Sequence, residues 1–180
     1  PVPQDHYSDS VLAKFVFDAS ESQRLRLTLE GTRDDLFTDV LSSVSAVAPM
    51  AGGSQTTALL GNDVQRRSRI ALDHEFAPTS ARWLDRGEWR LYWQRSETSQ
   101  ETLEHRLSAS FSGVVTPQAR WRDFGFEQKE MGGEVTLFGS FETGVAAHTL
   151  AYGLEYVETR TAQLRTGLQT NLATGTTSST

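Results

Sequence analysis

The chain has 180 residues, with 17 Lys and Arg against 23 Asp and Glu, and therefore a formal net charge of −6. Nucleic-acid-binding domains usually present a basic face, so this charge balance argues against a nucleic-acid partner. The sequence contains no cysteine, which excludes disulfides and thiolate metal sites. No segment approaches the roughly eighteen consecutive apolar residues of a transmembrane helix, but a barrel strand crosses lipid with only about ten alternating residues.

Apolar and polar residues alternate along two segments near the N-terminus, 9–18 and 23–34. In the second segment Leu25, Leu27 and Leu29 alternate with charged or polar residues. A period of two residues predicts β-strands, and the short polar connection between the segments predicts a hairpin.

Four further segments alternate in the same way and are predicted as strands: 65–77, 87–107, 118–141 and 147–161. Within the fifth strand the apolar residues change parity between Phe126 and Val135, which predicts a bulge or bend at Met131-Gly132-Gly133. Residues 142–144 are predicted as a tight turn. Residues 35–64, 108–117 and from 162 onward lose the alternation, so we expect surface loops there.

The predicted connections are short and long in turn, which is the layout of an outer-membrane barrel. The predicted fold is therefore all-β: a segment of an antiparallel up-and-down transmembrane β-barrel, with about six long strands and long extracellular loops. A soluble up-and-down barrel or sandwich also has alternating strands and stays open as an alternative. Aromatic residues near the strand ends would suit the interfacial girdles of a membrane barrel: Phe17, Phe76, Trp83, Trp89, Phe141 and Tyr156.

An ordered series of blocks resembles TonB-dependent outer-membrane receptors of the haem and haemoglobin (transferrin, lactoferrin) group. The blocks are 11–17 with 23–30, 69–76 with 83–98, and 122–129 with 150–156. The resemblance implies that residues 1–180 are part of the β-barrel domain of such a receptor, without its plug domain and remaining barrel strands. It also implies a location in the bacterial outer membrane and a barrel of the 22-stranded transporter class.

The function implied by the resemblance is import of haem iron, possibly from haemoglobin or another haem carrier. The implied partners are haem or a haem-carrier protein at the extracellular face, TonB through the plug domain, and outer-membrane lipid. Two alternatives stay open: a receptor of the same architecture for a siderophore or other nutrient, and a soluble all-β binding module. The motifs that flank the haem-binding histidine in the family do not occur in this sequence, so no family ligand is assigned to a residue.

Several histidines invite a ligand role, but their surroundings favour other interpretations. On a strand, His74 points away from Asp73 and Glu75, which predicts a wall histidine and not a metal ligand. Glu101 and His105 share a strand face, where contact with haem is conceivable but solvated polarity is expected. Neither His6 nor His148 has a partner at ligand spacing.

A charged strand face is the other candidate site. Its members are Arg24, Arg26, Arg67, Arg69 and Arg90 with Glu30, Asp73 and Glu75. Such arginines would attract haem propionates, but we predict a lumen-facing network in which opposite charges pair across strands. No serine, histidine and acidic set stands in a nucleophile-elbow context, so no enzymatic activity is predicted. The sequence assigns no catalytic, cofactor-binding or metal-binding residue.

Overall fold

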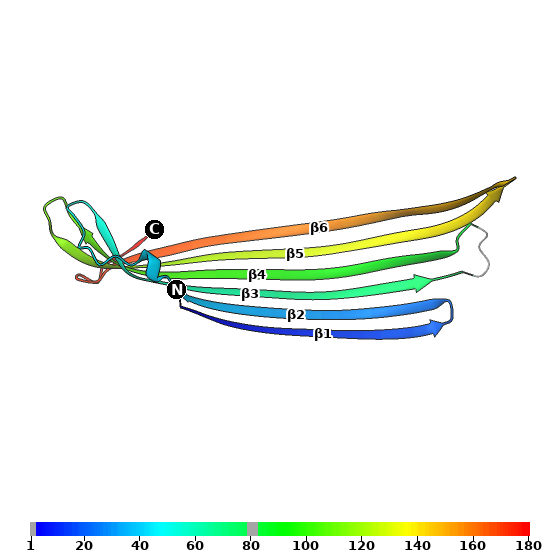
Figure 1. Ribbon diagram of the computed structural model, residues 1–180, viewed down its shortest axis with the longest axis horizontal. Coiled ribbons are helices and arrows are strands. Elements are labelled where there is room, and N and C mark those ends of the chain that lie inside the picture. The colour runs from blue at the N-terminus through cyan, green and yellow to red at the C-terminus, as the bar shows by residue number, and fades with distance from the viewer. Residues whose placement is uncertain (1–2, 79–82) are drawn as a thin grey trace.

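A computed structural model describes residues 3–78 and 83–180 of the chain. These residues form one open antiparallel sheet of seven strands, in which each strand pairs with its neighbours in sequence. Figure 1 shows a long, gently curved sheet that does not close into a barrel. The strands are β1 (Gln4–Ser20), β2 (Gln23–Asp39), β3 (Ser54–Phe76), β4 (Arg86–Ala109), β5 (Val115–Thr143), β6 (Ala146–Asn171) and β7 (Thr177–Ser179).

The six predicted strands are present in the predicted order, but they are longer than predicted, and β7 is a seventh strand in a segment that was predicted as loop. β5 has 29 residues and β6 has 26, so at about 3.3 Å per residue β5 spans roughly 95 Å. Residues 35–39 and 54–64, predicted as loop, belong to β2 and β3, and residues 162–171 belong to β6. These segments have few apolar residues, yet their backbone groups still pair with the adjacent strand, so polar composition concealed them.

The predicted bulge at Met131-Gly132-Gly133 is wrong. The register of β5 against β4 runs without a shift through this point, where Gly132 lies opposite Tyr92 and Gly133 opposite Leu91. A Cβ atom on Gly132 would lie 2.7 Å from the ring of Tyr92, and one on Gly133 would lie 2.8 Å from Leu91 Cδ2. The two glycines therefore make room for large cross-strand neighbours, and the apolar residues of β5 change face along a regular strand.

The two-residue turns lie at one end of the sheet and the long connection 40–53 lies at the other (Figure 1). The predicted alternation holds only in part, because residues 77–85 connect β3 to β4 at the turn end and are longer than the connection 110–114 at the loop end. At the turn end, Glu21 and Ser22 connect β1 to β2, and Gly144 and Val145 connect β5 to β6. Gly144 has a φ of 62°, a left-handed conformation that favours glycine. The tight turn predicted at 142–144 thus lies slightly further along the chain. At the loop end, residues 40–53 connect β2 to β3 and residues 110–114 connect β4 to β5.

The only helical element in the described part of the chain is the three-residue 3-10 turn η1 (Leu41–Ser43), and no helix there is long and apolar enough to cross a membrane.

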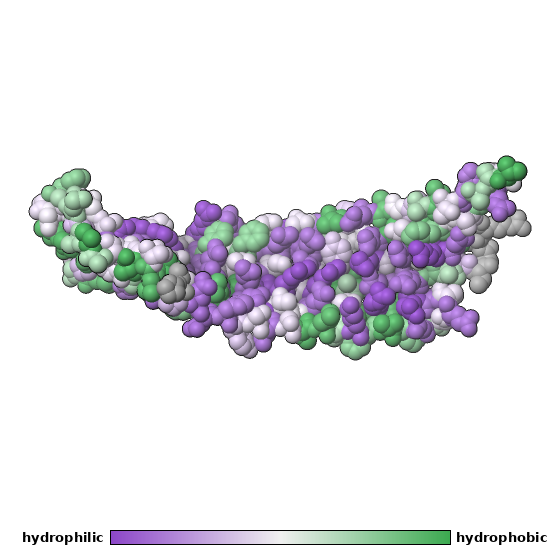
Figure 2. All heavy atoms as spheres, in the orientation of Figure 1, coloured by the Kyte–Doolittle hydropathy of each residue, from purple (hydrophilic) through white to green (hydrophobic). Residues whose placement is uncertain are grey.

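The sheet has almost no buried core. Among the described residues, the only buried hydrophobic side chains are those of Ala71, Leu84 and Ala109. Large apolar side chains instead lie on the surface, where Phe15 is 60% exposed and Leu154 is 73% exposed. Figure 2 shows one face, on which hydrophilic atoms cover much of the middle and hydrophobic atoms gather at both ends and along the lower margin. The sheet therefore has two open faces whose chemistry decides what can cover them.

Candidate functional site

Large apolar side chains from six strands lie on one face of the turn-end half of the sheet. The strand register sets this arrangement, because residues that lie opposite each other on paired strands share a face. We call these side chains the apolar band: Val11, Ala13, Phe15 and Phe17 of β1; Leu25, Leu27 and Leu29 of β2; Ile70, Leu72, His74 and Phe76 of β3; Trp89, Leu91 and Trp93 of β4; Met131, Val135, Leu137 and Phe141 of β5; and Leu150, Tyr152, Leu154 and Tyr156 of β6.

His74 lies in the apolar band, as its predicted orientation requires. Its ring stacks on Phe76 and meets Trp89 edge-on, with centroid distances of 5.4 Å in both cases. Asp73 and Glu75 lie on the opposite face of β3. In the described ranges, no group of three or more His, Asp or Glu side chains is arranged to hold a metal ion.

The predicted girdle aromatics mark both margins of the apolar band. Phe17, Phe76, Trp89 and Phe141 lie near the strand ends at the turn end, and Trp83 lies in the connection between β3 and β4. Tyr156 lies well inside β6 and not at a strand end. It is the last apolar residue of the band on that strand, because Glu158 follows it on the same face.

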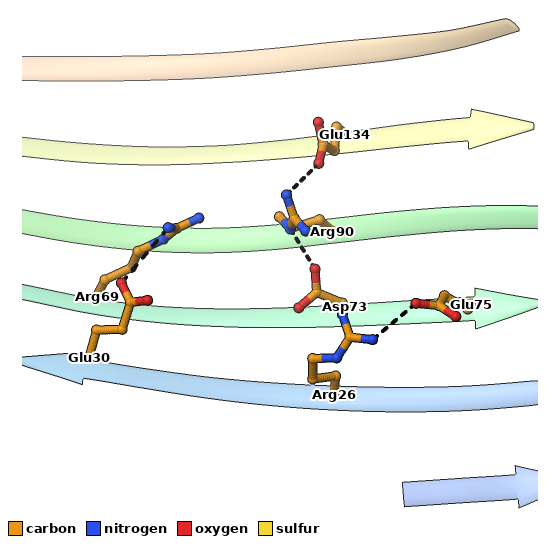
Figure 3. Close-up of polar contacts among 7 residues, drawn as sticks. All are labelled: Arg26, Glu30, Arg69, Asp73, Glu75, Arg90 and Glu134. Carbon is orange, nitrogen blue, oxygen red and sulfur yellow. Dashed lines mark hydrogen bonds and ion pairs between the residues drawn. The ribbon is translucent and has the colours of Figure 1, made fainter. Parts of the chain in front are cut away.

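The opposite side of the same strands, which we call the charged face, has a network of ion pairs (Figure 3). Arg90 joins two strands, with its Nε 2.5 Å from Asp73 Oδ1 and its Nη1 3.0 Å from Glu134 Oε1. Arg26 Nη2 lies 3.2 Å from Glu75 Oε1. The predicted pairing of charges across strands is therefore confirmed.

Other members of the charged face pair more loosely or with partners that the sequence did not indicate. Arg69 Nη1 lies 3.8 Å from Glu30 Oε2, and Arg24 Nε donates to Asp18 Oδ1 over 2.6 Å. Arg67 donates to the amide oxygen of Gln94 over 2.7 Å and not to a carboxylate.

Glu134 is the member of this network that sequence reasoning missed. It lies directly opposite Arg90 in the register of β5 with β4. The bulge wrongly predicted at 131–133 would have moved Glu134 to the other face, because a shift of one residue inverts every side chain beyond it. An unbroken alternation from Glu130 to Glu134 is the signal that would have placed it correctly.

The remaining candidate residues lie apart from this network. Glu101 and His105 share one face, as predicted, and it is the face of the apolar band, extended toward the loop end. His6 Nε2 lies 3.6 Å from Asp34 Oδ1, a pair between β1 and β2 that sequence spacing does not indicate. His148 stacks on Phe141 with a centroid distance of 4.9 Å, and its Nε2 lies 2.6 Å from Thr143 Oγ1.

A row of charged side chains borders the apolar band on its loop side. Arg95, Lys129 and Arg160 lie side by side on β4, β5 and β6, on the same face as the band. Glu127 Oε1 lies 3.0 Å from Lys129 Nζ and 2.7 Å from Arg95 Nε. The close contact with Lys129, with the positive charge of Arg95, lowers the pKa of the Glu127 carboxyl group against the opposing effect of its partial burial. These charged side chains separate the apolar band from a single apolar row nearer the loop end, formed by Leu60, Leu103, Trp121 and Leu168.

The sequence matches no known protein-family model and no curated protein. The resemblance to haem and haemoglobin receptors therefore stays a prediction.

Proposed function

We propose that the sheet forms part of the wall of a transmembrane β-barrel in the bacterial outer membrane. The observation that supports this most strongly is the apolar band lying back to back with the charged face on the same six strands. Exposure of large apolar side chains such as Phe15 and Leu154 to water costs free energy. Lipid on the band side and a water-filled lumen on the charged side would suit both faces.

The height of the apolar band agrees with this proposal. On β5 the band runs from Met131 to Phe141, which is roughly 33 Å along a strand that rises about 3.3 Å per residue. A strand tilt of about 40° reduces this to about 25 Å, the height of the apolar belt of outer-membrane barrels.

The open edges of the sheet also favour a barrel. β1 pairs only with β2, and β6 pairs with β7 over only three residue pairs, Leu168 to Thr170. In lipid, unpaired backbone N–H and C=O groups along such long edges are costly, and a closed barrel removes them. We therefore expect further strands to continue the wall on both sides.

The connections set the orientation of the wall. In outer-membrane barrels the short turns face the periplasm and the longer loops face the outside. By this rule the loops 40–53 and 110–114 are extracellular, and β5 descends from the cell surface toward the periplasm.

We further propose that the complete barrel is a TonB-dependent receptor that imports haem iron. Haem or a haem carrier would be captured at the loop end, and a plug domain would connect the receptor to TonB. The ordered sequence resemblance supports this choice of cargo, and the two-sided sheet supports a barrel wall. A ferric-siderophore receptor would have the same wall.

The barrel wall is tested by labelling two adjacent residues of this sequence, which has no cysteine of its own, after replacing any cysteine elsewhere in the full-length protein. In the full-length protein in outer membranes, Leu154→Cys is expected to place a spin label in lipid, where it is accessible to oxygen. Glu155→Cys is expected to place the label in water, where it is accessible to a hydrophilic nickel complex. Equal water accessibility of both labels would refute the barrel wall.

The cargo is tested by growth with a single iron source. Deleting the gene is expected to abolish growth on haem iron and to leave growth on ferric siderophore unchanged. The reverse result would identify a siderophore receptor and overturn the haem assignment alone.

A further inference from the structure

The loop-end half of the charged face holds a second set of arginines in a different setting. We call it the arginine patch: Arg106 of β4, Arg120 and Arg122 of β5, and Arg165 of β6. They share the face of Arg90 and Glu134, because the register of β4, β5 and β6 shows no shift between the two halves. Across residues 96–108, 118–128 and 161–171, the only carboxylate on this face is that of Glu104, and on the neighbouring β3 Asp63 lies opposite Gln100 on the same face. The patch therefore has excess positive charge.

The cations of the patch are poorly satisfied by the protein itself. Glu104 Oε2 lies 3.7 Å from Arg120 Nη1 and 3.5 Å from Arg122 Nη2, so one carboxylate serves two guanidinium groups at long range. Arg120 has a second partner, because it donates to Gln169 Oε1 over 2.9 Å. Within the described ranges Arg122 and Arg165 make no side-chain hydrogen bond. Buried Arg106 Nε also has no hydrogen-bond partner among the described residues.

The surface is hollowed at this point. A hollow of about 660 Å³ is lined by Gln100, Thr102, Arg122, Phe124 and Arg165, among others. This volume is within the usual range of small-molecule sites. The guanidinium carbon of Arg165 lies 5.0 Å from the ring centre of Phe124, so a cation and an aromatic surface meet in one wall of the hollow.

The strand register gives Arg122 and Arg165 a clamp-like arrangement. Arg165 lies opposite Phe124, and Gly167 lies opposite Arg122. Arg122 and Arg165 are thus diagonal neighbours across two strands, a relation in which Cα atoms are about 7–8 Å apart. Two guanidinium forks at that spacing suit two anionic groups of one ligand, or one group held from both sides.

We propose that this hollow binds an organic anion in which carboxylate or phosphate groups are attached to a flat apolar body. Arg122 and Arg165 hold the anionic groups, and Phe124 contacts the flat body. This inference rests on the proposed function to the extent that it places the hollow in the lumen wall, on the route from the loops. It also shifts the expected anion contact away from Arg26 and Arg90, whose charges are already paired with carboxylates.

The same geometry separates the arginine patch from the histidine candidate. Glu101 and His105 lie on the opposite face of β4 from Thr102 and Glu104. A ligand in the hollow therefore does not meet His105, and binding should not require a metal that histidine can coordinate.

The test uses the full-length protein purified in detergent and two metal-free probes with neutral counterparts. One pair is protoporphyrin IX, a dicarboxylate, with its dimethyl ester. The other is riboflavin 5′-phosphate with riboflavin. At least one anionic probe is expected to bind more tightly than its neutral form, and the preferred probe distinguishes a carboxylate ligand from a phosphate ligand.

Arg122→Gln and Arg165→Gln are each expected to weaken binding of the preferred anionic probe by about tenfold to a hundredfold, with little effect on the neutral form. Arg122→Lys should recover only part of the affinity, because lysine lacks the fork. The matched control is Arg66→Gln, which removes one positive charge from the opposite face and should leave the affinity unchanged.

Three results would overturn the proposal: neither anion binding better than its neutral form, equal affinities of the Gln variants and the wild type, or an equal loss in Arg66→Gln. The labels at Leu154→Cys and Glu155→Cys report the barrel wall independently. Correct labelling with no arginine-dependent binding would refute this site alone, whereas arginine-dependent binding with both labels in water would refute the barrel wall alone.

Discussion

The apolar band and the charged face lie on the same strands, one residue apart, yet they require opposite surroundings. Leu154 and Glu155 are neighbours in β6, and the first lies in the band while the second lies opposite Glu134 on the charged face. In a soluble protein, one face of a sheet usually packs on a core. In the described part of the chain neither face packs on protein, and under the proposed barrel wall the two faces would meet lipid and water.

The most severe test of this comparison is to place the same charge on each face. Leu154→Arg would put a guanidinium group into lipid, and we expect it to cost about 2–4 kcal/mol of folding free energy if the residue lies near the bilayer midplane. Glu155→Arg should leave the folding free energy unchanged or stabilise the fold slightly, because the new residue attracts Glu134, whereas Glu155 repels it. Urea unfolding of the full-length protein in lipid vesicles measures both. Equal costs would remove the distinction between the faces.

The second test concerns the paired charges. Arg90→Met would leave Asp73 without its closest partner, and that side chain is only 13% exposed. We expect a loss of about 1–3 kcal/mol, the cost of an unsatisfied polar group. The double variant Arg90→Met with Asp73→Leu should recover much of that loss, since both charges are then gone. Arg160→Met is the control, because Arg160 is 77% exposed and its removal should not change stability measurably.

A third test addresses the glycines opposite Tyr92 and Leu91. Gly132→Ala is expected to destabilise the sheet by about 1–2 kcal/mol, because the new methyl group would lie 2.7 Å from the Tyr92 ring. Tyr92→Ala in the same chain should remove that specific penalty. Gly125→Ala should instead be neutral or stabilise by about 0.5 kcal/mol, because its nearest neighbour would be 3.9 Å away and glycine is entropically costly in a strand. Equal effects at both glycines would argue against a packing role.

The strands that could be predicted from the sequence are those in which apolar and polar residues alternate. Strands such as β2 were predictable because Leu25, Leu27 and Leu29 alternate with polar residues, and the pairing of β1 with β2 followed from the short connection between them. The start of β3 and the end of β6 were not predictable, because residues 54–64 and 162–171 contain mostly polar and small residues and their few leucines and valine show no sustained alternation. Their strand conformation depends on pairing with a long neighbour, which local composition does not encode.

The charged sites were predictable to different degrees. The charged face was identifiable because Arg24, Arg26 and Glu30 recur at a period of two. The arginine patch was not, since Arg106, Arg122 and Arg165 are far apart in sequence and meet only through the register of three strands. An error of one residue in that register would exchange faces, so a site of this kind needs the structure.

The smallest expected effect is a pH dependence of the folding free energy. It arises at Glu127, beside the charged side chains of Arg95 and Lys129 that border the apolar band. Because contacts with Lys129 and Arg95 lower the pKa of Glu127 in the folded state, the ionised carboxylate stabilises the fold. This contribution is fully present above the ordinary pKa of a glutamate and is lost as the pH falls through the lowered folded value. The effect is small because the pair is exposed and screened by salt.

This pH dependence is measured most directly by following the carboxyl group itself. In an NMR titration of the full-length protein, the Glu127 signal should titrate below the range of an unperturbed glutamate, and Lys129→Met should move it upward because the contact that lowers the pKa most is gone. Glu142 lies at the turn end of β5, away from Lys129, and is the control position whose signal the substitution should not affect. An unchanged Glu127 titration in Lys129→Met would mean that Lys129 does not hold the carboxylate. The row of charged side chains that includes Arg95 and Lys129 would then border the apolar band without stabilising the fold through its ion pair with Glu127.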